Sequence, residues 1–160
     1  MGALPPRSRF EAAVGAGNAL LARSGFRERG RADELEAWLQ TDTPYPNPDP
    51  ADLLDSPFLV VHEIVEIAEA KRMGLRITKD VIVRNMEAIN DAHLVAAEAE
   101  LAIAAAEGDV AYVDSRNADL RSWCDDPLLT ASQKAAYEAL RDRIGTWLER
   151  ANAGRRTEGL

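Results

Sequence analysis

The sequence is poor in residues that cross-link a chain. Cys124 is its only cysteine, so one chain can form neither an internal disulfide nor a zinc site built from thiolates. Histidine is almost as scarce, with His62 and His93 alone. A metal site in this chain would therefore depend on these two imidazoles and on carboxylates.

Long apolar segments are also missing. The longest apolar run, Leu101 to Ala106, is far too short to cross a bilayer. The first ten residues lack the apolar stretch of a signal peptide. These absences predict a soluble, cytoplasmic protein with no membrane partner.

Positive charge is in deficit. Lys and Arg number 19 against 27 Asp and Glu, which gives a formal net charge of -8. Nucleic acids need clustered cations to displace their counterions, so DNA and RNA are not expected partners. A 46% apolar and 29% charged composition is typical of a folded protein. The length of 160 residues favours one domain, predicted over residues 1–151, followed by a flexible polar tail at 152–160.

Apolar residues recur at helical intervals throughout, and no run alternates as a strand would. The sequence therefore predicts an all-α bundle of five to six helices. Its centre is a long antiparallel pair over residues 57–73 and 79–107, and the other helices are expected at 9–22, at 32–40, after Asp109 and after Thr130.

Capping residues mark several helix ends. Ser56 followed by Pro57 is a strong helix start, and Gly74 supplies a matching stop. Thr130 and Gln133 have the spacing of a capping box. Ser8 and Glu11 share that spacing and predict the first helix start.

Residues 43–50 carry a proline at every second position. This pattern favours an extended, polyproline-like path. The segment is interpreted as a stiff linker over the helices, and a recognition peptide for an aromatic groove is the alternative.

The helix predicted over 57–73 has one broad apolar arc and one acidic face. The acidic face carries His62, Glu63, Glu66 and Glu69, with His62 and Glu66 one turn apart. It is either the solvated side of an amphipathic helix or a ligand-bearing face.

In the helix predicted over 79–107, Asn90, His93 and Glu100 fall within the apolar arc. A buried polar group must find a partner, so these side chains are either internal polar pins or ligands. If the two central helices pack antiparallel, His93 approaches His62 and Glu66. The candidate metal ligands are then His62, Glu63, Glu66 and His93, a set suited to a divalent cation such as zinc, manganese or iron. This requires that the polar face of 57–73 be covered.

The segment HEIVEIAEAKRMG, residues 62–74, resembles the first metal-binding helix of the all-α MazG-like nucleoside triphosphate pyrophosphatases. In that family an ExxE and an ExxD motif bind magnesium, which holds the phosphates of a nucleotide and activates water. The resemblance covers about residues 59–91. It implies a second ligand set of Glu63, Glu66, Glu87 and Asp91, with Asn90 at the place of the family's aspartate, and a dimeric bundle.

Two functional hypotheses follow. The first is a homo-oligomeric or adaptor-type interaction domain, with Asn90, His93 and Glu100 as buried polar pins and another protein as its partner. The alternative is a divalent-metal-dependent nucleotide pyrophosphohydrolase that uses magnesium, manganese or zinc. The sequence assigns no catalytic residue.

Overall fold

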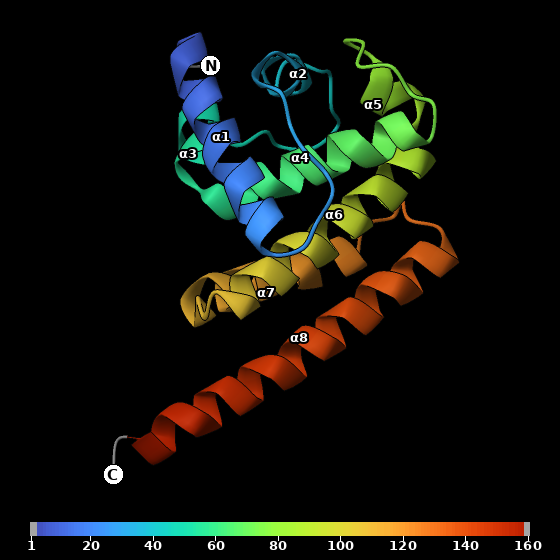
Figure 1. Cartoon of the computed structure of the whole chain (residues 1–160). Coiled ribbons are helices and arrows are strands. Elements are labelled where there is room, and N and C mark those ends of the chain that lie inside the picture. The colour runs from blue at the N-terminus through green and yellow to red at the C-terminus, as the bar shows by residue number, and fades with distance from the viewer. Residues whose placement is uncertain (1–2, 159–160) are drawn as a thin grey trace. The chain divides into compact units, whose positions relative to one another are not determined.

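The computed structural model describes residues 3–158, and these residues form helices and loops without a strand (Figure 1). The predicted all-α class is confirmed, but the number of helices is higher than the predicted five to six. The eight helices of the described residues are α1 (Arg7–Arg23), α2 (Ala32–Trp38), α3 (Pro50–Asp55), α4 (Pro57–Arg72), α5 (Val81–Arg84), α6 (Met86–Ala106), α7 (Val110–Cys124) and α8 (Ala131–Glu158).

The chain divides into two compact units, Met1–Ile103 (unit 1) and Ala104–Leu160 (unit 2). The boundary lies in the last turn of α6, within the stretch that the sequence predicts as one domain. Unit 1 contains α1 to α5 and most of α6, and unit 2 contains α7 and α8.

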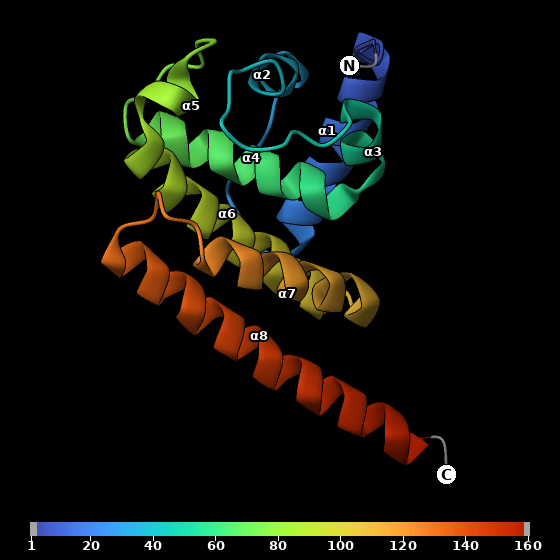
Figure 2. The ribbon, with the colours of Figure 1, turned by 180° about the vertical axis from the view of Figure 1, so that it is seen from behind.

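In unit 1, α4 is the central helix. Helices α1, α2 and α3 pack against it, and α1 also contacts α2 and α3. Figures 1 and 2 show α4 between α2 and α6. Half of α4 is buried, from both its apolar and its polar face, namely Val60, Val61, His62, Ile64, Val65, Glu66, Ile67 and Ala70. The helix is therefore covered on more than one side.

Both ends of α4 are set by local sequence, as predicted. The Ser56 side chain accepts a hydrogen bond from the Leu59 N–H, and Pro57 occupies the first turn. At the other end Gly74 has a φ of +85°, a conformation that glycine adopts without steric cost. Its N–H bonds the Lys71 carbonyl and the Leu75 N–H bonds the Ala70 carbonyl, which closes the helix.

The helix predicted over 79–107 is broken at Asn85, so the expected long central pair does not form in that length. The Asn85 side chain donates to the Val81 carbonyl at 2.8 Å, the acceptor that a continuing helix would offer to the Asn85 N–H. The Asn85 backbone leaves the helical region, with φ -132° and ψ 38°. A short α5 and a 21-residue α6 replace the single helix.

The proline-rich segment has no regular secondary structure and bends at Pro44 and Tyr45, until Pro50, where α3 begins. Asp49 caps this helix by accepting from the Ala51 N–H at 2.8 Å. The sequence reading missed α3 because it interpreted the prolines as a continuous linker, whereas the last proline begins a helix. The predicted capping box at Ser8 is wrong: α1 begins at Arg7 after Pro6, with no side-chain cap.

Unit 2 is an antiparallel hairpin of α7 and α8, which pack against each other. The Thr130–Gln133 capping box is confirmed: the Gln133 N–H donates to the Thr130 hydroxyl, and the Thr130 N–H donates to the Gln133 side-chain oxygen. Helix α8 continues to Glu158, where the sequence predicts a flexible tail from residue 152.

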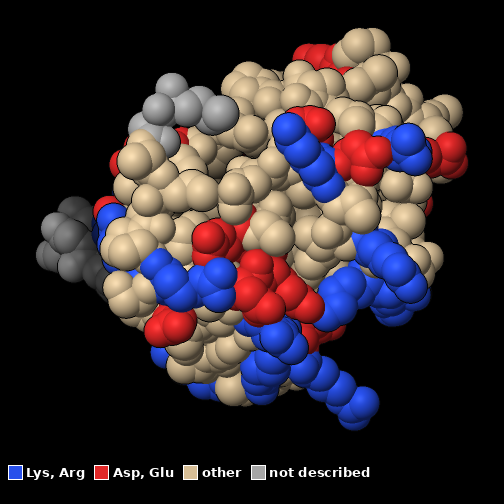
Figure 3. All heavy atoms as spheres, turned by 90° about the horizontal axis from the view of Figure 1, so that it is seen from above, with Lys and Arg blue, Asp and Glu red and all other residues tan. Residues whose placement is uncertain are grey.

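The surface carries acidic and basic side chains side by side. The face seen in Figure 3 shows both signs close together, and Arg7–Glu36 at 2.5 Å and Lys71–Glu34 at 2.7 Å are examples of ion pairs in unit 1. Among residues 3–158 there is no helix that is both long enough and apolar enough to span a membrane.

Candidate metal centre

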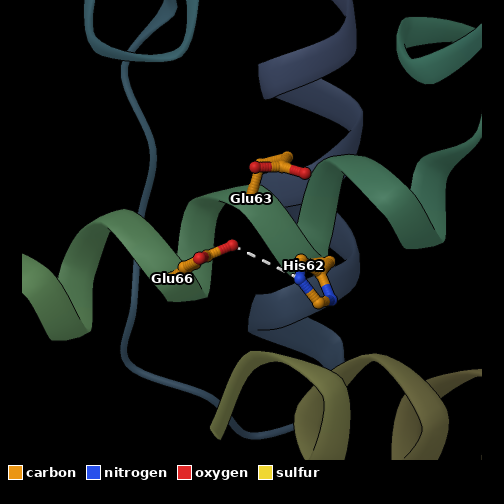
Figure 4. Close-up of side chains that lie close together, drawn as sticks. All are labelled: His62, Glu63 and Glu66. Carbon is orange, nitrogen blue, oxygen red and sulfur yellow. Dashed lines mark ion pairs between the residues drawn. The ribbon is translucent and has the colours of Figure 1, made fainter. Parts of the chain in front are cut away.

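Three ionisable side chains of α4 meet within one turn of the helix. His62 and Glu66 are four residues apart and therefore face the same way, and the His62 Nε2 lies 3.4 Å from a Glu66 carboxylate oxygen. Figure 4 shows this pair together with Glu63, which points to the other side of the helix from the His62 ring. One ligand-type atom from each of the three residues lies within 4.8 Å of the others. This is a group of donors that one ion could share.

Helix α6 contributes a carboxylate to the other side of the imidazole. The Glu100 Oε2 lies 2.6 Å from the His62 Nδ1. Glu100 is fully buried, and His62 and Glu66 are 3% and 6% exposed. When Nδ1 carries a proton and donates it to Glu100, a neutral His62 keeps a lone pair on Nε2, on the side of Glu66. A carboxylate behind a histidine is the arrangement that orients metal-binding imidazoles.

Helix α2 reaches the same group from the opposite side of α4. The indole N–H of Trp38 donates a hydrogen bond to a Glu63 carboxylate oxygen at 2.9 Å. Trp38 is 4% exposed, while Glu63 is half-buried. Three helices therefore supply the cluster: α4 its candidate ligands, and α2 and α6 the groups that hold them.

The electrostatics of the cluster favour bound protons when no metal is present. Burial by itself lowers the pKa of His62, but its hydrogen bonds to Glu100 and Glu66 outweigh burial and raise the pKa to about 10. Burial raises the pKa of Glu63 to about 7, helped by the negative charge of Glu66 and opposed by His62 and by the Trp38 hydrogen bond. A proton and a metal ion would compete for the same groups.

The spacing of the donors suits a small ion. Two ligands that each lie about 2 Å from one ion are themselves about 3–4 Å apart. The 3.4 Å separation of His62 Nε2 and Glu66 Oε2 has this value, whereas the donor atoms of all three residues lie within 4.8 Å and would draw closer around an ion. One imidazole with two carboxylates is a donor set compatible with zinc, manganese or iron.

The interpretation of the acidic face of α4 as its solvated side is wrong for His62 and Glu66, which α4's neighbours cover. Glu69 lies nearer the surface, with its side chain 14% exposed, and forms a 2.7 Å ion pair with the exposed Arg72. The sequence could not decide this because one helix does not reveal which of its faces its neighbours occupy.

The three polar residues predicted on the inner arc of α6 lie in different settings. Asn90 and Glu100 are buried, as expected, and His93 is half-buried. The His93 ring meets the His62 ring edge to face, with centroids 4.8 Å apart. His93 thus lies beside the cluster, but it is not one of the three residues whose donor atoms converge.

The ligand set implied by the family resemblance is only half assembled. Glu63 and Glu66 belong to the cluster, but Glu87 and Asp91 are exposed on α6 and are not part of it. Glu87 and Asp91 lie on the outer side of α6 because Asn90 and Glu100 face inward.

Two residues of the cluster were not predicted in their roles. Glu100 was recognised as an inward-facing polar residue, but its partner lies 38 residues away in the sequence. Trp38 gave no signal other than its place on the apolar side of a short helix.

Compared with models of protein families, with curated proteins and with solved structures, the chain gives no match.

Proposed function

We propose that this protein binds one divalent transition-metal ion in unit 1, with His62, Glu63 and Glu66 as ligands. The observation that supports the proposal is the convergence of these three side chains within 4.8 Å. Glu100 would fix the His62 tautomer so that Nε2 accepts the ion.

The charge of the cluster adds to the argument. Three carboxylates, those of Glu63, Glu66 and Glu100, surround one imidazole in a largely buried space. Buried carboxylates need compensation, and a divalent cation supplies more positive charge than the proton it displaces from His62. The ion would allow Glu63 to remain ionised.

The ion is expected to be zinc, manganese or iron rather than magnesium. Magnesium prefers oxygen ligands in octahedral geometry and keeps several waters, whereas an imidazole ligand suits the transition metals. The burial of His62 and Glu66 leaves little space for such a hydration shell.

A structural ion in a helical interaction domain is the role that burial favours. The ion would tie α4 to α2 and α6, since each of these helices holds one of its ligands. We also propose that this domain forms a homo-oligomer or binds a protein partner. A pyrophosphohydrolase of the MazG-like class would need an open coordination position and the ligands Glu87 and Asp91, and their exposure on α6 argues for the structural role.

The test is the metal content of the purified protein after loading with zinc, manganese, iron or magnesium and gel filtration, by elemental mass spectrometry. We expect one transition-metal ion per chain, lost after chelation and lost in Glu66→Gln and His62→Ala. Glu69→Gln is the matched control, because Glu69 lies on the same helix but outside the cluster.

His93→Ala separates the ligand set predicted with His93 from the set of His62, Glu63 and Glu66 that converge on α4. Loss of the ion in this variant would place His93 among the ligands, and retention would limit the set to α4. If wild-type protein retains no ion under any of the four loading conditions, the metal proposal is wrong. The cluster would then be a buried set of ionic contacts that links α4 to α6.

A further inference from the structure

The loop that leads to the helix of Trp38 is held against α4 at Gly30, by contacts that do not involve the candidate metal ligands. The Asn18 side chain brackets Gly30, accepting from its N–H at 2.7 Å and donating to its carbonyl at 3.1 Å. A Cβ at position 30 would lie 2.5 Å from the Ile64 side chain, so only glycine allows this loop to approach α4 so closely. The loop that leads into α2 therefore packs directly against α4.

Helix α2 itself is tied to its neighbours at three points. Glu36 pairs with Arg7 of α1 and Glu34 pairs with Lys71 of α4, while Trp38 ends the helix over Glu63. The two exposed ion pairs contribute little free energy. Together with the close approach of Gly30 to α4, they define where the Trp38 indole lies. After Trp38 the chain is held again, because the Thr41 hydroxyl donates to the Trp38 carbonyl and the Asp42 N–H donates to the Lys79 carbonyl.

From this geometry we infer that Trp38 is a positioning residue of the metal centre, which presents one oxygen of Glu63 to the ion by holding the other oxygen. The inference rests on the proposed metal binding. A carboxylate on a long side chain has three rotatable bonds, and a hydrogen bond to a buried indole restricts that freedom before the ion binds. Groups of this kind behind a ligand typically change metal affinity by about 10- to 100-fold when removed.

The indole also makes the metal centre observable. Trp38 donates directly to a candidate ligand, whereas Trp123 and Trp147 lie in unit 2. Binding of an ion at Glu63 should change the emission of Trp38, and a paramagnetic ion such as Co²⁺ should quench it.

The test is a titration of the full chain with Co²⁺, followed by visible absorption and by competition with Zn²⁺, on Trp38→Phe, Glu63→Gln and the double variant. We expect Trp38→Phe to raise the Kd by about 10-fold or more. The double variant should bind no more weakly than Glu63→Gln alone, because an indole that acts only through the Glu63 carboxylate has nothing left to position. Trp147→Phe is the matched control and should keep the wild-type Kd.

Replacement of Trp38 by 3-benzothienylalanine keeps the shape of the side chain and removes only the N–H, so it protects the experiment against a packing defect in Trp38→Phe. An unchanged Kd in this variant, or additive losses in the double variant, would overturn the role of Trp38. Failure of the wild type to bind Co²⁺ would instead overturn the metal proposal on which the inference rests.

Discussion

Different kinds of polar contact stabilise each of the two units of this protein. In unit 2 each helix begins with a local cap. The Asp109 side chain accepts a hydrogen bond from the Tyr112 N–H at the start of α7, and Thr130 and Gln133 form a capping box at the start of α8. In unit 1 the decisive polar contacts join helices that are distant in sequence, such as His62 with Glu100 and Trp38 with Glu63. Local caps also begin α3 and α4 in unit 1, but only unit 1 adds an ionisable cluster that needs three helices in place.

The largest effect is expected from removing the centre of that cluster. His62→Ala leaves Glu66 and Glu100 buried without the group they share, so unit 1 should lose about 3–5 kcal/mol of unfolding free energy. Urea denaturation, followed by hydrogen exchange resolved to α4 and α8 peptides, would measure each unit. His93→Ala, which removes a ring that is only half-buried, is the control and should cost much less.

The second effect is a dependence of unit 1 on pH in the presence of a chelator. Folding raises the pKa of Glu63 from 4.5 to about 7 and that of His62 from 6.5 to about 10. Between these values the folded protein keeps protons that the unfolded chain has released, so the unfolding free energy falls as pH rises. We expect a loss of a few kcal/mol between mildly acidic and strongly basic pH.

The same exchange experiment at several pH values would check this dependence. A bound transition metal should reduce it, because the ion replaces the proton on His62. An unfolding free energy that stays level or increases over this range would show that the cluster does not hold its protons as described.

A smaller loss of unfolding free energy is expected at Gly30, where the loop before α2 packs against α4. Gly30→Ala forces a methyl group against Ile64, and overpacking of this kind costs about 1–3 kcal/mol. Gly15→Ala is the control, because its Cβ meets no atom within 4 Å and α1 should gain about 0.5–1 kcal/mol from alanine. Equal melting temperatures for the two variants would contradict the close approach at Gly30.

The smallest effect concerns unit 2. Thr130→Ala removes one half of the capping box and should cost about 1 kcal/mol, detected as faster hydrogen exchange in the first turn of α8. Thr146→Ala, in the middle of α8 with an exposed hydroxyl, should change little. A loss that spreads to α4 peptides would mean that the units are not separately organised.

The sequence predicted best what depends on neighbours in the chain. The ends of α4 followed from Ser56, Pro57 and Gly74, and the start of α8 from Thr130. The break at Asn85 was missed, because an asparagine that bonds the carbonyl four residues earlier looks no different in sequence from one that points to solvent. The short α3 was also missed, because Pro50, its first residue, was interpreted as the last residue of the proline-rich linker.

Of the candidate site, the sequence alone determined the inventory: two histidines, the carboxylates one turn apart on α4, and the inward register of Asn90 and Glu100 on α6. Helical periodicity fixes these relations within one helix. Only the tertiary structure decided that the polar face of α4 is covered, that Glu100 rather than His93 bonds the His62 imidazole, and that Trp38 holds Glu63. These contacts depend on which helices pack together, and that choice comes from the burial of many apolar side chains at once.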